Sequence, residues 1–167
     1  MPSQAITQAL VAEVNYRLFE ECVPRIKNCL DRLTEAQIWW RPNPQSNSIG
    51  NLVLHLCGNV RQWIISGVGE QADIRRRPEE FSEQGPVPVP ELLRLLNGLE
   101  PDVRQVLAKI GPDELLRVKP VQVYEQTVLS MLVHVTEHFS YHTGQIAWIT
   151  KMLKNEDLGF YAGQALE

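Results

Sequence analysis

Apolar side chains recur every three or four residues along four long stretches of the chain, which is typical of helices with one apolar face. The first stretch covers residues 4–33, and Pro24 inside it is expected to kink or loosen the helix, because proline lacks the N–H that a helix needs. A loop follows over residues 39–47, where two prolines and two asparagines occur together. Ser48 is a good N-cap for a second helix over about 49–66.

The third stretch is bounded by residues that end helices. A long connection over residues 67–89 leads to a helix that begins near Pro90, a residue suited to a first helical turn. Pro101 interrupts its hydrogen bonding, so we expect two helical pieces end to end, and the Gly-Pro pair at 111–112 stops them. A short extended segment is then expected over residues 118–124.

The fourth stretch is expected to begin with Thr127 as its cap and to continue to about Lys154. Four long helical segments in a chain of 167 residues indicate a four-helix bundle, in which each helix buries its apolar stripe against the others. We therefore predict an all-α fold, with one domain over residues 1–167.

Charge and composition narrow the classes of partner. The net charge of −4 argues against nucleic acid, and no apolar run approaches the roughly 20 residues of a membrane span. The N-terminus has no pattern of a secretion signal, so we expect a cytoplasmic protein. The only basic run, Arg75–Arg77, is followed by Pro78 and two glutamates, and it is interpreted as a solvated loop, with phosphate binding as a distant second interpretation.

The three cysteines, Cys22, Cys29 and Cys57, lie in helical patterns and have no metal-like spacing. An odd number of cysteines does not make a disulfide framework. We expect small buried apolar residues in a reducing compartment rather than a disulfide or a thiol nucleophile.

Three of the four histidines lie four residues apart near the end of the chain, at His134, His138 and His142. Histidines at i and i+4 lie on one helical face and can reach a single ion. All three cannot, because His134 and His142 are about 12 Å apart along the axis and rotated by about 80°. The helix therefore supplies one adjacent pair, and a third ligand must come from elsewhere, where His55 is the remaining histidine. The inward stripe of this helix is expected to contain Met131, Val135, His138, His142, Ile146 or Gln145, Ile149 and Leu153.

Two other interpretations of these histidines were weighed. A zincin motif is excluded, because it needs His-Glu-x-x-His and here Glu137 precedes His138; Glu137 is expected to pair with His134 or to face solvent. A bundle without metal, in which the histidines are core residues, stays open, since one i, i+4 pair arises by chance. Buried imidazoles without partners are costly, however, and a shared metal removes that cost.

Two phrases carry a resemblance to a known family. NSIGNLVLHLCGNVRQWI at 47–64 and HVTEHFSYHTGQI at 134–146 resemble the DinB-like superfamily of damage-inducible four-helix-bundle proteins, and LTEAQIWWRP at 33–42 fits its usual lead-in. The resemblance covers most of the chain and is loose at the ends and over 112–125. It implies an up-down-down-up bundle.

The resemblance also implies a divalent metal, nickel or zinc most often, held by His55, His138 and His142. His134 matches a common family histidine that is not usually a ligand, and we expect it to support the site or the core without touching the ion. Other candidate pocket residues, one or two turns from the histidines, are Asn59 and Gln62, followed by Arg61, Tyr141 and Gln145.

Three histidine ligands leave a coordination position open, as catalytic sites do. The resemblance implies metal-dependent hydrolases and transferases that use low-molecular-weight thiols, so we expect such an enzyme acting on a small molecule. The alternative is a stress-associated metal-binding or interaction bundle without turnover. No nucleic-acid or membrane partner is expected, and a homodimer is left open as the assembly.

Overall fold

The computed structural model describes residues 2–85 and 87–165, and its first helical segment changes character just before Pro24. Helix α1 (Pro2–Asn15) and helix α2 (Val23–Arg32) are joined by a π-helical stretch, η1 (Tyr16–Cys22). Proline cannot donate the hydrogen bond that the preceding turn expects, and wider π-turns accommodate such a loss. The helix therefore loosens where the sequence predicted it would.

The second segment starts at a capped N-terminus. The Ser48 side chain accepts a hydrogen bond from the Asn51 N–H, and the Asn51 side chain returns to Ser48, which closes a capping box. Helix α4 (Ile49–Val60) then continues without a break into a second π-helical stretch, η2 (Arg61–Val68). The predicted helix over 49–66 is confirmed, with a short helix α3 (Glu35–Ile38) before it.

The third segment is divided as Pro101 predicted. Helices α6 (Val89–Asn97) and α7 (Leu99–Leu107) lie end to end with Gly98 between them. The connection before them contains a further helix, α5 (Arg77–Ser82), which the sequence did not reveal. Pro86, within the predicted connection over 67–89, lies outside the described residues.

The predicted extended segment over 118–124 is one arm of a hairpin. After the short helix α8 (Pro112–Leu115), strand β1 (Val118–Val121) pairs antiparallel with β2 (Tyr124–Thr127). The prediction was wrong in extent, because the chain turns back at Gln122, whose φ is 54°. Thr127 then caps helix α9 (Val128–Lys154) by accepting from the Ser130 N–H, as expected.

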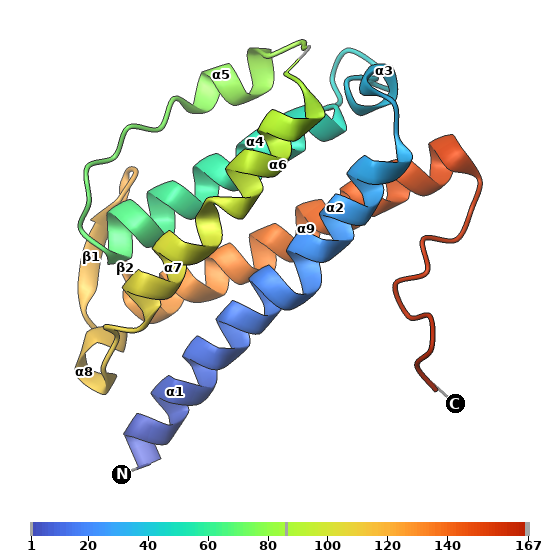
Figure 1. Ribbon diagram of the computed structural model, residues 1–167. Coiled ribbons are helices and arrows are strands. Elements are labelled where there is room, and N and C mark those ends of the chain that lie inside the picture. The colour runs from blue at the N-terminus through green and yellow to red at the C-terminus, as the bar shows by residue number, and fades with distance from the viewer. Residues whose placement is uncertain (1, 86, 166–167) are drawn as a thin grey trace.

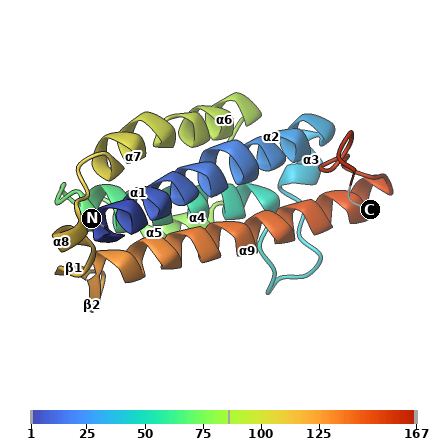
Figure 2. The same ribbon diagram turned by 90° about the horizontal axis from the view of Figure 1, so that it is seen from below.

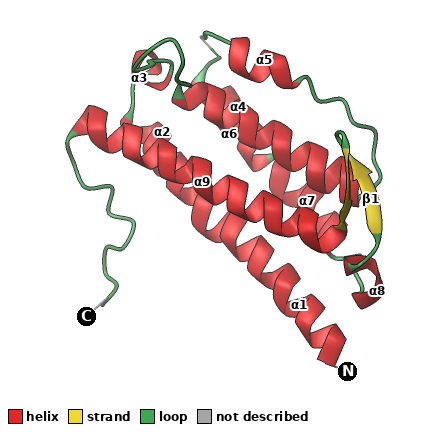
Figure 3. Ribbon diagram, turned by 180° about the vertical axis from the view of Figure 1, so that it is seen from behind, coloured by secondary structure: helices red, strands yellow, loops and turns green. Residues whose placement is uncertain are grey.

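The four long segments form an up-down-down-up bundle (Figure 1). α1–α2 and α9 run toward one end, while α4–η2 and α6–α7 run back toward the end that carries the hairpin, as the view from below also shows (Figure 2). Because α4 and α6 run the same way, a long connection must return along the outside of the bundle. Seen from behind, that connection carries α5, and its other described residues have no regular structure (Figure 3).

Helix α9 buries a seam that differs from the predicted one by one position at its centre. Val135 and Phe139 are at most 1% exposed and Thr143 is buried, whereas His138 and His142 are half-buried. The prediction that both histidines occupy the core-facing seam was therefore wrong, since Phe139 and Thr143 fill those places. His138 and His142 lie along the edge of the seam, where their polar nitrogens can face a cavity.

The cysteines behave as the sequence predicted. Cys22, Cys29 and Cys57 are buried and free, and burial raises the pKa of the Cys57 thiol to about 12. A thiol with so high a pKa carries almost no thiolate at neutral pH, so Cys57 is a packing residue. Separately, none of the helices in the described part of the chain combines the length and apolarity that a membrane crossing needs.

Candidate metal centre

Three histidines from two helices converge beside the connection that carries α5. His55 comes from α4, and His138 and His142 come from α9, one turn apart. Each offers one ring nitrogen, and the three nitrogens all lie within 4.8 Å of one another. The closest pair is His55 Nε2 and His138 Nε2, 3.1 Å apart. Nitrogens this close can share one ion at bonds of about 2.0–2.1 Å, so the cluster can hold a metal.

Hydrogen bonds on the far side of two rings fix which nitrogens face the centre. His55 Nδ1 lies 2.9 Å from Glu80 Oε2 and 3.1 Å from Arg75 Nη2, and His142 Nδ1 lies 2.7 Å from Gln145 Oε1. The carboxylate is the nearer group to His55 Nδ1. Since carboxylate and amide oxygens only accept, each Nδ1 carries the hydrogen and each Nε2 keeps a free lone pair. Metal-binding histidines are typically oriented in this way.

The glutamate that orients His55 belongs to a buried ion pair. Arg75 is 3% exposed and Glu80 is 9% exposed at their side chains, and two guanidinium nitrogens donate to the two carboxylate oxygens at 2.7 and 2.8 Å. Arg75 also donates to Gln62 Oε1 at 2.8 Å. The interpretation of Arg75–Arg77 as a solvated loop is therefore wrong for Arg75, although Arg76 and Arg77 are exposed.

Glu80 remains an anion despite its burial. Burial raises the pKa of its carboxyl, but hydrogen bonds from Arg75 and His55 outweigh burial and hold that pKa below its usual range. An ionised Glu80 is a strong acceptor for the His55 ring. Sequence reasoning missed both members of this pair, because they lie in a connection without any periodic pattern.

Two histidines of the cluster, His138 and His142, are held neutral. Burial lowers the pKa of His138 to about 3, with further lowering by His142, His55 and His134. Burial also lowers the pKa of His142 and of His134. Only the neutral imidazole binds a metal, so His138 and His142 are in the ligating form at neutral pH.

Acidification of the metal-free protein is expected to destabilise it as the pH falls from 6.5 toward 3. In that range unfolded His138 takes up a proton that the folded state excludes, so stability present above pH 6.5 is lost at about 1.4 kcal/mol per pH unit for each such proton. Urea unfolding at several pH values measures the slope. His138→Gln is expected to be shallower, and equal slopes would contradict this assignment.

Gly58 gives the buried ion pair its room against α4. A Cβ at this position would lie 2.9 Å from Arg75 Nε and closer still to the Glu80 carboxylate. Gly58→Ala is expected to cost about 1–3 kcal/mol of stability, because overpacking outweighs the helix propensity of alanine. Gly144→Ala in α9, where no atom lies within 4 Å, is the control and is expected to stabilise by about 0.5–1 kcal/mol. Thermal unfolding measures both, and a stabilised Gly58→Ala would contradict the crowding.

His134 lies outside the cluster of three. Its ring stacks on Trp63, with centroids 4.0 Å apart, and its centroid is 5.4 Å from that of His138. Within residues 2–85 and 87–165 its side chain makes no hydrogen bond, so the structure gives it a packing contact. Glu137 is exposed and faces solvent, one of the two outcomes expected for it.

The other expected pocket residues divide into two groups. Asn59 lines a cavity of about 370 Å³ that His55 and His138 border, and Gln145 and Gln62 bond to His142 and Arg75. Tyr141 packs edge-on against His142, with centroids 5.0 Å apart. Arg61, by contrast, points away and contacts Asp102 at 3.5 Å.

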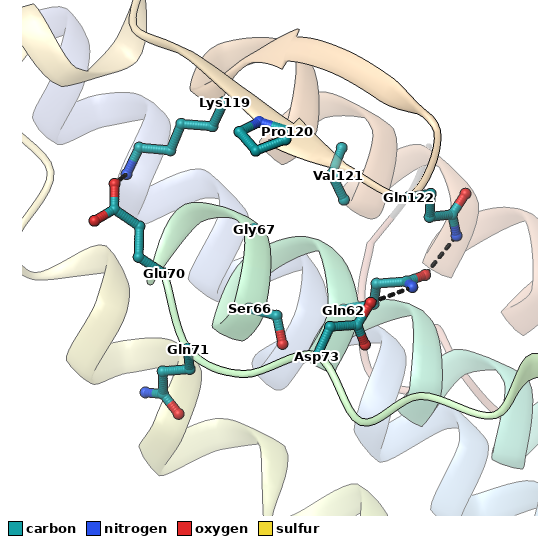
Figure 4. A pocket seen from close by; sticks show the side chains of 10 residues that line it. All are labelled: Gln62, Ser66, Gly67, Glu70, Gln71, Asp73, Lys119, Pro120, Val121 and Gln122. Atoms are coloured by element: carbon teal, nitrogen blue, oxygen red, sulfur yellow. Dashed lines mark hydrogen bonds and ion pairs between the residues drawn. The ribbon is translucent and has the colours of Figure 1, made fainter.

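A second cavity, of about 500 Å³, has Gln122 on its wall in common with the first (Figure 4). Gln62 bonds to both Asp73 and Gln122 on its wall, and Lys119 pairs with Glu70 there. No histidine lines this cavity among the described residues. His55 and His138 therefore border the smaller of these two cavities.

Comparison with known proteins places the chain in a family. Residues 7–162 match the family described as "Protein of unknown function (DUF1572)". A conserved protein from Enterococcus faecalis has a similar structure, with a TM-score of 0.72 and 17% identity over 90% of this chain and 98% of that one. A DinB-like protein from Bacillus cereus has a TM-score of 0.62 and 15% identity over 81% and 87%. A search of curated proteins found no match. The chain therefore belongs to the DUF1572 family and has a DinB-like fold.

Proposed function

We propose that this protein is a metal-dependent enzyme in which His55, His138 and His142 hold one divalent ion, nickel or zinc, and that it acts as a thiol transferase or hydrolase on a small substrate. The observation that carries the proposal is the convergence of one ring nitrogen from each of three histidines, all within 4.8 Å of one another. Imidazole nitrogens suit zinc and nickel, and three protein ligands are typical of catalytic rather than structural zinc sites.

The surroundings of the cluster support catalysis over simple storage of an ion. His55 and His138 border the 370 Å³ cavity, so a small molecule can approach the centre from that side. An ion bound there lowers the pKa of a coordinated water or thiol. Within residues 2–85 and 87–165 the cavity is lined by no carboxylate, so no anion there competes with the hydroxide or thiolate that such an ion favours.

The protein's own residues have three tasks in this proposal. Glu80 orients the His55 ring through the Nδ1 hydrogen bond. Gln145 orients the His142 ring in the same way, through a neutral amide oxygen. Phe81, whose ring packs against His55 with centroids 4.7 Å apart, covers part of the cluster with aromatic surface.

A paired activity screen of tag-free protein tests the proposal. Nickel- and zinc-loaded protein is assayed for addition of small thiols to electrophiles and for hydrolysis of activated amides, beside metal-free protein and His55→Ala. We expect turnover that needs both the ion and His55. Stoichiometric metal binding without thiol binding or turnover in either assay would instead support a metal-binding bundle without catalysis.

A further inference from the structure

Buried polar atoms without partners gather at one place in the molecule. Four buried side-chain atoms in the described part of the chain have no hydrogen-bond partner, and three belong to residues that line the 370 Å³ cavity. These three are Asn59 Oδ1, Trp63 Nε1 and His138 Nδ1. Asn59 is 4% exposed and Trp63 is 6% exposed. Buried polar groups are nearly always paired, so these three atoms are exceptions among the residues that surround the cavity.

The charges around this cavity have one sign. Arg75 and Arg77 line it, and no aspartate or glutamate does so among the described residues. Arg75 is neutralised by Glu80. Arg77 lies over the Phe81 ring at 4.9 Å and makes no ion pair within residues 2–85 and 87–165. The side chains that the hairpin and the start of α9 contribute, from Gln122, Tyr124, Gln126 and Ser130, are neutral and polar.

The wall of the cavity therefore carries two kinds of chemistry. His55 and His138 present the candidate metal position, and Arg77 presents a guanidinium that has no ion pair among the described residues. Such a group binds carboxylates and phosphates through paired N–H donors. A volume of about 370 Å³ is within the size range of small-molecule sites, roughly 300–1,000 Å³.

We infer that this cavity binds a small anionic substrate whose carboxylate or phosphate group pairs with Arg77 while its reacting group faces the histidine cluster. The inference rests on the proposed function, because it names the class of substrate for that same centre. The expected preference of the cavity for anionic ligands nevertheless comes from Arg77 and not from the ion.

Matched hydroxamates on cobalt-loaded protein test the inference, because a hydroxamate binds an open metal position and its tail can be varied. Succinic monohydroxamate carries a carboxylate tail, and butyrohydroxamate carries a methyl group at the same distance. Malonic and glutaric monohydroxamates have shorter and longer chains between the two groups, and each is compared with its own neutral counterpart. Binding is followed by the visible spectrum of the cobalt ion. We expect at least one acidic compound to bind about five- to tenfold more tightly than its neutral counterpart.

Variants test whether Arg77 causes the preference for the acidic compounds. Arg77→Gln is expected to remove the preference, whereas Arg76→Gln, at an exposed neighbour that does not line the cavity, is expected to keep it.

The possible failures are distinguishable. If cobalt does not bind through the three histidines, the proposed function fails. If cobalt binds but no acidic compound exceeds its neutral counterpart, or the preference survives Arg77→Gln, this inference alone is overturned.

Discussion

Replacing His142 with alanine is expected to weaken the binding of zinc or nickel by about 100-fold or more while the helical circular dichroism persists. The loss is large because two remaining imidazoles cannot fill the coordination sphere that three provide. The fold persists because His142 is half-buried at the edge of the seam, whereas Phe139 and Thr143 fill its centre. Isothermal titration of tag-free protein measures the affinity, and binding that remains stoichiometric in the His138→Ala, His142→Ala double variant would contradict the site.

His134→Ala is the matched control on the same helix. This variant removes an imidazole one turn from His138. The His134 ring stacks on Trp63 and lies outside the cluster. The ion is therefore expected to keep a shell of three protein nitrogens in this variant, as X-ray absorption would measure. A shell reduced to two nitrogens would make His134 a ligand and would require a different arrangement from the one described.

The helices and their ends could be predicted because local chemistry determines them. Ser48 and Thr127 cap helices where their side chains suggested, and the prolines at 24 and 101 disturb helices for a reason that depends only on the missing N–H. Only the first strand of the hairpin was predicted. Its turn depends on a positive φ at Gln122, and glutamine is not a residue that indicates such a turn.

The histidine cluster was predictable in part for a similar reason. The spacing of His138 and His142 gives a shared face from helical geometry alone, and His55 was the one remaining histidine. Its support by Glu80 and Arg75 depends on how a long connection folds back over α4, which no periodicity encodes. Gly58 leaves room for Glu80 and Arg75 against α4, and the need for a glycine there can be recognised only when the path of the connection is known.

Removing either member of the buried pair alone is expected to destabilise the protein by about 3–5 kcal/mol, because a buried charge is then left without its partner. Glu80→Leu strands the Arg75 guanidinium, which is 3% exposed, and Arg75→Met strands the Glu80 carboxylate. Urea unfolding of the metal-free protein measures both. Glu91→Leu is the control, since its partner Arg94 is 68% exposed, and the loss of such a surface pair is expected to cost less than about 1 kcal/mol.

The double variant Arg75→Met, Glu80→Leu separates the two roles of this pair. Replacing both charges with apolar side chains leaves no unpaired ion, so stability is expected to return close to that of the original protein. The His55 Nδ1–H, however, has lost the acceptor that orients the ring, and metal affinity is expected to stay about 10–100-fold lower. A double variant that recovers both stability and metal affinity would show that the pair only holds the connection against α4. Recovery of stability without recovery of affinity would show that Glu80 prepares His55 to bind the ion.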